Sequence, residues 1–127
     1  MTTERPSTGR RRQAERAGRL VETLTLLVYL CLGFRPLARR LRTPVGEIDL
    51  LARRRRLVVA VEVKYRASTD IAAWSITEQN RRRIVDATRW WLASDSTGAD
   101  CAIRFDAVLW APWSLPRRIV GAFEAHE

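Results

Sequence analysis

The sequence predicts a single α/β domain in which helices flank a central mixed sheet. Two stretches place their apolar residues at helical spacing, while three shorter runs have the length and apolar content of β-strands. The chain has 127 residues, of which 46% are hydrophobic and 29% charged, so it can bury one core. The expected order of elements is α-β-β-β-α-β.

The N-terminal part is expected to contain an arm and a helix. Residues 1–12 are polar with three consecutive arginines, which indicates a disordered basic arm before a single domain over 13–127. The apolar stripe predicts a helix over 14–32, and Gly33 suits its end. The apolar run resembles a signal peptide, but Glu22 interrupts it, no small-residue cleavage motif follows, and it is too short for a bilayer. We therefore expect a core helix and no membrane partner.

The middle of the chain predicts strands. Residues 34–42 are short and basic, and Pro36 lacks the N–H that a central strand needs, so any strand there belongs at an edge. Residues 45–52 and 57–64 are apolar runs of strand length on either side of four arginines. We interpret them as a β-hairpin.

The register of this hairpin decides which side chains meet. A two-residue turn at 54–55 would place Glu47 opposite Glu62, and alternation would then put Asp49 and Lys64 on the same face. Two acids directly opposed repel each other unless a positive charge lies between them. A divalent cation or Lys64 could supply that charge.

The second half predicts a helix and one clear strand. Residues 75–78 have the sequence of a capping box, which would start a helix that runs to about Ala93. Residues 101–110 alternate between apolar and polar positions, which is typical of a half-buried strand. Asp106 on its polar face is expected to pair with a nearby arginine. Residues 117–124 could form a short strand or a helical turn.

The charge of the chain favours an anionic partner. The net charge is +9, and residues 1–60 hold 14 arginines against five acids, whereas residues 61–127 are neutral overall. Nucleic acid is the simplest partner for such a surface, although an anionic membrane surface or solubility alone would also account for it.

The residue types narrow the chemistry. The single histidine, His126, stands next to the C-terminus, so triads and zinc sites built on histidine are excluded, and a metal site would use carboxylates and bind Mg²⁺ or Mn²⁺. Cys31 and Cys101 are far apart in apolar segments, which gives no disulfide framework and favours a reducing, cytoplasmic location.

Lys64 is the only lysine beside 22 arginines. On a solvated surface the two cations are roughly exchangeable, but a site that needs a compact ammonium cannot use arginine. Lys64 follows Glu62 by two residues on an apolar strand, which points to a chemical role. The alternative is a surface lysine at the end of a strand.

The hairpin acids and Lys64 suggest a metal-assisted phosphodiester hydrolase. Asp49 and Glu62 would hold a hard cation, with the Val63 carbonyl as a third ligand. The cation would polarise the scissile phosphate and acidify a bound water, and the Lys64 ammonium would stabilise the developing charge or orient that water. The alternative is an inert ion pair at the end of a strand, and Glu47 is expected at the exposed rim of the sheet.

The hairpin also resembles a known family. The segment Gly46–Leu50 followed by Val61–Arg66 resembles the YraN family of largely uncharacterised bacterial proteins, which is similar to archaeal Holliday-junction resolvases. That family shares the restriction endonuclease-like fold and its PD-(D/E)xK motif. The resemblance covers roughly residues 14–110 and is most specific in the hairpin.

The resemblance implies roles for four acidic and basic residues. Asp49 would be the aspartate of the motif, and Glu62 and Lys64 its ExK part. Glu22 on the first helix would be the upstream acid that completes a magnesium site, although a solvated position at the edge of the apolar stripe is the alternative. The implied activity is a Mg²⁺-dependent endonuclease.

The expected partner is DNA, branched or single-stranded, and RNA stays open. A non-catalytic nucleic-acid-binding protein on the same scaffold is the alternative function, and a homodimer is open. Candidate phosphate contacts are basic residues of the hairpin turn, the end of the second hairpin strand and the second helix, each of which could equally be a solvated arginine: Arg53, Arg54, Arg66, Arg81 and Arg82.

Overall fold

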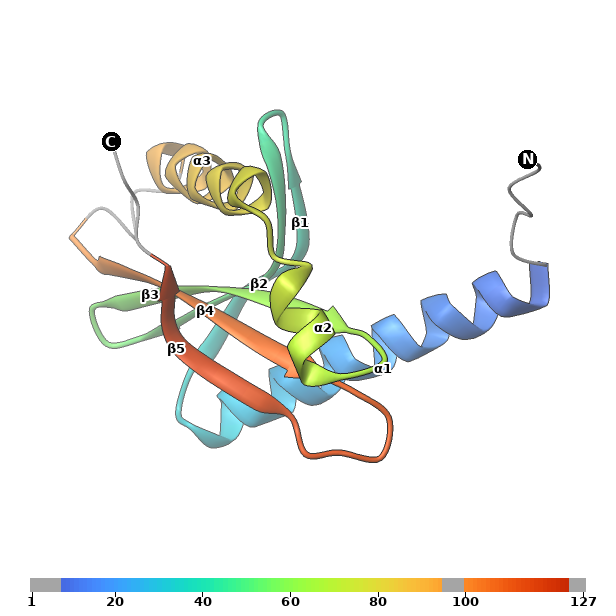
Figure 1. Ribbon diagram of the computed structural model, residues 1–127. Coiled ribbons are helices and arrows are strands. Elements are labelled where there is room, and N and C mark those ends of the chain that lie inside the picture. The colour runs from blue at the N-terminus through green and yellow to red at the C-terminus, as the bar shows by residue number, and fades with distance from the viewer. Residues whose placement is uncertain (1–7, 95–99, 124–127) are drawn as a thin grey trace.

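The computed structural model describes residues 8–94 and 100–123 and confirms the expected α/β class. A five-stranded sheet in the order β1-β2-β3-β4-β5 is flanked by helices (Figure 1). The elements are α1 (Thr8–Cys31), β1 (Arg35–Thr43), β2 (Gly46–Arg54), β3 (Leu57–Tyr65), α2 (Thr69–Trp74), α3 (Glu78–Ser94), β4 (Ala102–Trp110) and β5 (Arg117–Phe123).

The sheet is mixed, as expected. Strands β1, β2 and β3 are antiparallel neighbours, β3 and β4 are parallel, and β5 is antiparallel to β4. The parallel pair requires a crossover, which α2 and α3 provide. Strand β1 lies at an edge, as Pro36 predicts, and its pairing with β2 is irregular between Pro36 and Ala38.

Helix α1 is longer than the sequence predicts. It begins at Thr8, so residues 8–12 of the expected arm belong to the helix, while residues 1–7 lie outside the described part of the chain. Its C-terminal half packs on the sheet through Val21, Thr25 and Tyr29, and its N-terminal half extends beyond the sheet (Figure 1). Within the described residues, no helix is long and apolar enough to cross a membrane.

Strand β3 lies at the centre of the sheet and is buried on both faces. Val59 and Val61 belong to the core beneath α1, whereas Val58 and Ala60 belong to the core beneath α3. A strand covered on both sides reads as a continuous apolar run, which is why 57–63 lacks polar alternation. The polar residues of β3 are confined to its C-terminal end.

The start of α3 differs from the expected capping box. The backbone N–H of Asn80 donates to Thr77 Oγ1 at 3.2 Å, so the side chain of Thr77, rather than that of Ser75, caps the helix. Ser75 instead ends the short helix α2, where its N–H donates to the Ala72 carbonyl. The prediction was wrong because α2, which the sequence pattern did not reveal, uses Ser75 first. The expected buried face of α3 is confirmed at Ile84, Val85 and Thr88.

Candidate active site

The observed hairpin register differs from the expected one by two residues. Arg54 pairs with Leu57, so the turn consists of Arg55 and Arg56, and the predicted pairing of Glu47 with Glu62 is wrong. Arg55 takes a left-handed conformation (φ 55°) that arginine rarely adopts, so no local pattern indicated this turn. A shift of two residues keeps the alternation of side chains, so the faces are unchanged.

The ladder between β2 and β3 ends where the polar residues begin. Its last pair is Leu50 with Val61, and the next residues along the two strands are Asp49 and Glu62. The Val63 N–H donates to Asp49 Oδ2 at 2.9 Å. The Asp49 side chain therefore takes the place of a ladder partner at this end of the hairpin and is held beside the strand that carries Glu62 and Lys64.

Lys64 and Glu62 form an ion pair, the contact that the sequence left open as the alternative to a metal site. Lys64 Nζ lies 2.9 Å from Glu62 Oε1, and the two side chains are only 18% and 10% exposed. Residues two apart in a strand project to the same side, so the sequence spacing alone brings them together. The compact ammonium is thus held among carboxylates in a largely dry environment.

The pKa of Asp49 is higher than that of an ordinary aspartate. Burial, followed by the negative charge of Glu62, raises the pKa of Asp49 to about 7 from an ordinary value of 3.8. The charge of Glu22 adds to this increase, while the Val63 N–H and Lys64 oppose it. Asp49 thus lies near two other acids, of which Glu62 is paired with Lys64.

Glu22 has a partner that the sequence did not suggest. Its carboxylate forms an ion pair with the guanidinium of Arg40 on strand β1, and its side chain is 23% exposed. Arg40 takes a left-handed conformation (φ 49°) within the edge strand, which no sequence pattern indicates. Glu22 lies close enough to act on the charge of Asp49, but its carboxylate is turned to Arg40.

The donor atoms are of the kind that a hard divalent cation prefers. Asp49 and Glu62 offer carboxylate oxygens, and their mutual repulsion in a largely buried site would be relieved by a positive charge. Within residues 8–94 and 100–123, no three acidic, cysteine or histidine side chains converge as a metal-binding group. A third side-chain ligand would require Glu22 to leave Arg40. The Val63 carbonyl remains an expected ligand.

The candidate phosphate contacts of the hairpin fall at opposite ends of the sheet. Arg66 is exposed and follows Lys64 by two residues. Arg53 and Arg54 lie beside the turn, at the opposite end of β3 (Leu57–Tyr65), a strand whose length is on the order of 25 Å. Arg54 also donates to the Leu32 carbonyl, so it helps to anchor the end of α1.

Arg81 and Arg82 lie on the exposed side of α3. Arg82 forms an exposed i,i+4 ion pair with Glu78 at 3.0 Å. The Arg81 guanidinium lies 5.7 Å from the centre of the Phe123 ring on β5. These contacts match a solvated helix face, and phosphate binding by either arginine stays a prediction.

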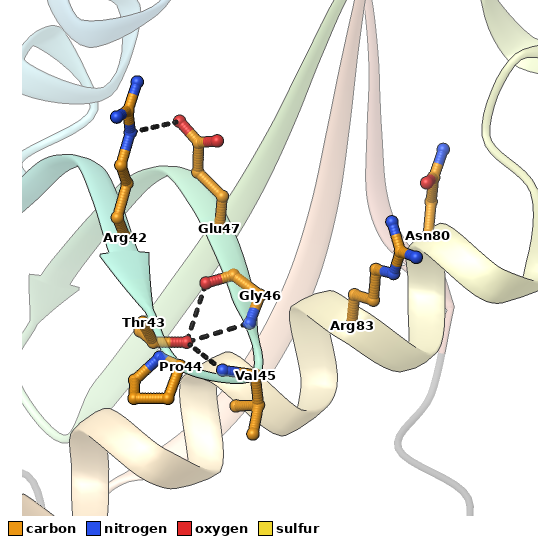
Figure 2. A pocket seen from close by; sticks show the side chains of 8 residues that line it. All are labelled: Arg42, Thr43, Pro44, Val45, Gly46, Glu47, Asn80 and Arg83. Carbon is orange, nitrogen blue, oxygen red and sulfur yellow. Dashed lines mark hydrogen bonds and ion pairs between the residues drawn. The ribbon is translucent and has the colours of Figure 1, made fainter.

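A shallow pocket of about 570 Å³ lies between the β1–β2 turn and α3 (Figure 2). Thr43 Oγ1 closes the turn, donating to the Gly46 carbonyl and accepting from the Gly46 N–H. The turn is pressed against α3, since a Cβ on Gly46 would lie 2.5 Å from the Arg83 carbonyl oxygen. Glu47 lines this pocket with its side chain 52% exposed, at the rim where the sequence placed it.

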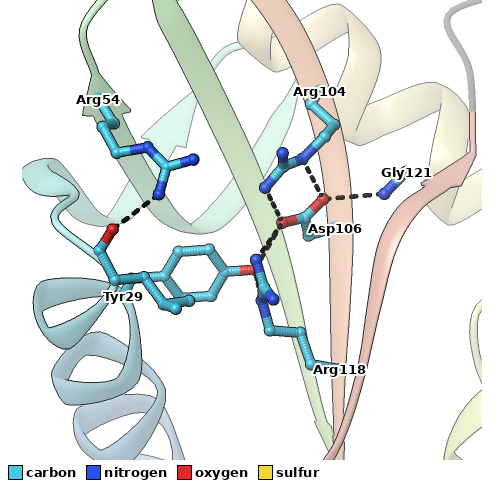
Figure 3. Close-up of polar contacts among 7 residues, drawn as sticks. Tyr29, Arg54, Arg104, Asp106, Arg118 and Gly121 are labelled. Atoms are coloured by element: carbon cyan, nitrogen blue, oxygen red, sulfur yellow. Dashed lines mark hydrogen bonds and ion pairs between the residues drawn. The ribbon is translucent and has the colours of Figure 1, made fainter.

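Asp106 is a structural anchor, as the sequence predicts (Figure 3). It is fully buried and accepts hydrogen bonds from Arg104, from the Tyr29 hydroxyl at 2.7 Å and from the Gly121 N–H at 3.0 Å. Burial and the neighbouring carboxylate raise the pKa of Tyr29 above its usual range. This cluster ties α1 to β4 and β5, and so fixes the helix that brings Glu22 to the site.

Comparison with known proteins places the chain among proteins of undetermined activity. The family model described as uncharacterised protein family UPF0102 matches residues 21–109, which confirms the resemblance to the YraN family. A UPF0102 protein of Bradyrhizobium sp. strain BTAi1 is 46% identical over 95% of this chain and 89% of its own length. One of Rhodopseudomonas palustris strain BisA53 is 47% identical over 94% and 92%.

Proposed function

Because the chain belongs to the uncharacterised protein family UPF0102, whose description assigns no activity, we propose a function from its candidate site. The protein is a metal-dependent endonuclease that hydrolyses phosphodiester bonds, most simply those of DNA. One observation carries this proposal: the only lysine of the chain is ion-paired to Glu62 at 2.9 Å, beside the buried carboxylate Asp49.

The residues of the site divide the chemical work. Asp49 and Glu62 would hold Mg²⁺ or Mn²⁺, joined by the Val63 carbonyl and by Glu22 once it leaves Arg40. The ion would supply a Lewis acid for the phosphate and a lowered pKa for a bound water. Asp49 would have to give up its proton to serve as a ligand, because metal and proton compete for the same oxygens.

Lys64 is the residue that faces the reacting phosphate in this proposal. Its ammonium stabilises the negative charge that develops on the phosphoryl oxygens, or orients the attacking water. If Asp49 and Glu62 held a cation, the negative charge of Glu62 would be shared between that cation and Lys64. Arg66, two residues further along, is the cation best placed to hold a neighbouring phosphate.

Substitution of Lys64 tests this proposal. Wild type, Lys64→Ala and Lys64→Arg are compared on labelled duplex, single-stranded and four-way-junction DNA, with Mg²⁺, Mn²⁺ or chelator. We expect metal-dependent products from wild type, and a loss of about 100-fold or more in both variants, since arginine keeps the charge but not the compact ammonium. Binding should change about threefold or less.

Arg89→Ala serves as the matched control, because Arg89 is exposed on α3 and is not among the candidate phosphate contacts. It should cleave like wild type. Cleavage by Lys64→Ala at the wild-type rate would refute the assignment.

A non-catalytic binding protein is the second candidate, favoured by the pairing of Glu22 with Arg40. It would show salt-dependent affinity for nucleic acid without turnover in any divalent ion. Metal-dependent nicking that disappears with Asp49→Ala would eliminate this candidate.

A further inference from the structure

Two tryptophans are almost wholly exposed, although tryptophan has the largest side chain of any residue type. Trp74, at the end of α2, is 86% exposed, and Trp113, in the turn after β4, is fully exposed. Trp110, by contrast, is partly buried, and its Nε1 donates to Thr25 Oγ1 at 2.9 Å. Single exposed apolar residues are common, but large aromatic ones gathered in one region indicate a binding surface.

Trp113 lies at the end of the sheet where the candidate site lies, and α2, which ends at Trp74, follows β3 directly in the chain. The Arg66 N–H donates to the Trp110 carbonyl at 3.1 Å, which joins the residue just after β3 to the last residue of β4. Trp113 follows Trp110 by three residues. Lys64 and Trp113 therefore belong to the same end of neighbouring parallel strands.

An ion pair connects α2 to this end. Arg117 at the start of β5 lies 3.9 Å from Asp70 on α2. Asp70 and Trp74 are four residues apart in a helix, so they share one face of α2. Trp74 is thus on the side of α2 that carries the ion pair to the start of β5.

The backbone conformation at Trp113 does not favour a tryptophan. Its φ is 60°, a left-handed conformation that is unfavourable for a bulky residue and natural for glycine. Because the side chain is fully exposed, no burial offsets this cost. A binding role accounts for a large aromatic group held in a strained and solvated position.

The charges around the tryptophans favour a polyanion over an apolar protein partner. Arg66 is exposed, and the Arg117 side chain is 58% exposed. Aromatic faces next to cations are what single-stranded nucleic acid requires, with bases stacked on the rings and phosphates near the guanidinium groups. A duplex offers no free base faces, because its bases are stacked on one another.

We propose that Trp74, Trp113, Arg66 and Arg117 form a binding surface for the unpaired bases of single-stranded nucleic acid. We call these four residues the tryptophan surface. The inference deepens the proposed nuclease function. It rests on that function for one statement only, that the bound strand is also the strand that is cleaved. It predicts a substrate with an unpaired segment next to the scissile bond.

The test measures binding in chelator, so that no cleavage is involved. The probes are a labelled single-stranded oligonucleotide and an abasic oligonucleotide of the same length, which keeps the phosphates but has no bases. We expect wild type to prefer the base-containing strand and Trp74→Ala/Trp113→Ala to lose about 10-fold or more in affinity for it, with abasic binding unchanged. Trp90→Ala, an exposed tryptophan on α3, is the control and should bind like wild type.

A second variant keeps the test valid if the double variant folds poorly. Trp113→Gly should raise the melting temperature, because glycine accepts the left-handed backbone, while affinity for the base-containing strand falls about fivefold or more. A purely structural tryptophan would lose stability when removed.

Three results would overturn the inference. Equal affinity of wild type for the two oligonucleotides would show that bases are not bound. Unchanged affinity in both tryptophan variants would locate base binding elsewhere. A concentration-dependent dimer of wild type that the tryptophan variants lose, without nucleic acid, would identify a second copy as the occupant.

The proposed nuclease function fails separately. Base-dependent binding without metal-dependent cleavage would leave the tryptophan surface intact and remove the enzyme, whereas cleavage that depends on Lys64 but not on the tryptophans would do the reverse.

Discussion

At the scale of single residues, the pairing of Lys64 with Glu62 is unusual because both side chains are largely withdrawn from water. Such pairs seldom add net stability, since the cost of desolvating two charges offsets their attraction. Apolar residues would fill the end of β3 at least as well. The proposed chemical role of Lys64 would give a reason for a charged pair at this position.

Asp49 gives a prediction on pH and stability. Its pKa in the folded protein is about 7, above its ordinary value of 3.8, so the folded state binds this proton more tightly than the unfolded state. Stability should therefore fall as pH rises from about 4 to 7. Asp49→Asn cannot ionise and keeps an oxygen for the Val63 N–H. At pH 8 it should exceed wild type by roughly 2 to 4 kcal/mol, at about 1.4 kcal/mol per pKa unit.

Denaturant unfolding in chelator at pH 4 and pH 8 measures this difference. At pH 4 the gap between the variant and wild type should be small, because Asp49 is protonated in the folded state. A gap of equal size at both pH values would contradict the assigned ionisation. Glu47→Gln, at an exposed position, is the control and should show little pH-dependent change.

At the scale of elements, the β1–β2 turn depends on one glycine. A methyl group at Gly46 would lie 2.5 Å from the Arg83 carbonyl oxygen, and neither backbone can yield without moving the turn or α3. Gly46→Ala should therefore lower the free energy of unfolding by about 1 to 3 kcal/mol. Thermal or chemical denaturation measures it.

Gly18→Ala is a matched control in helix α1. A Cβ at Gly18 meets nothing within 4 Å, and alanine is the better helix former, so stability should rise by about 0.5 to 1 kcal/mol. Equal effects of the two substitutions would mean that the turn does not pack against α3 as described.

The elements that the sequence predicts well are those set by local periodicity. The hairpin strands, the buried face of α3 and the pairing of Glu62 with Lys64 all follow from side-chain spacing. The two-residue error in register did not move Asp49 off the shared face, because strands alternate with a period of two. The error in the turn therefore did not change which side chains were predicted to share a face.

Other features depend on tertiary structure and left no local signal. Helix α2 is a single short element whose cap and end use residues that also suit a loop. The partner of Glu22 depends on a left-handed arginine in an edge strand, 18 residues away. Sequence spacing cannot anticipate either the conformation or the contact, so it did not predict that Glu22 pairs with Arg40.

At the scale of the whole molecule, the arginines lie at separate ends of the sheet. Arg66 follows the candidate site directly, whereas exposed Arg55 in the hairpin turn lies on the order of 25 Å away along β3. That distance corresponds to about seven base pairs at 3.4 Å each. Only a substrate of at least that length could contact both regions.

Substrate length therefore distinguishes the two arginines. Arg66→Ala should weaken binding of short and long DNA alike, whereas Arg55→Ala should weaken only substrates longer than about seven base pairs. Affinities for a length series at fixed salt measure this, with losses of about threefold to tenfold. Equal sensitivity of the shortest substrate to both substitutions would show that the nucleic acid does not run from the site toward the turn.

The edge strand β1 has a consequence for assembly. An exposed edge offers unpaired backbone groups to which another strand can add, and proteins block such growth with charged residues, proline and irregular pairing. Strand β1 combines all three, with Pro36, a shift in register and four arginines: Arg35, Arg39, Arg40 and Arg42. The arginines of β1, which contribute to the basic charge of the chain, thus also disfavour edge-to-edge aggregation of the sheet. We expect any homodimer to form through a different surface.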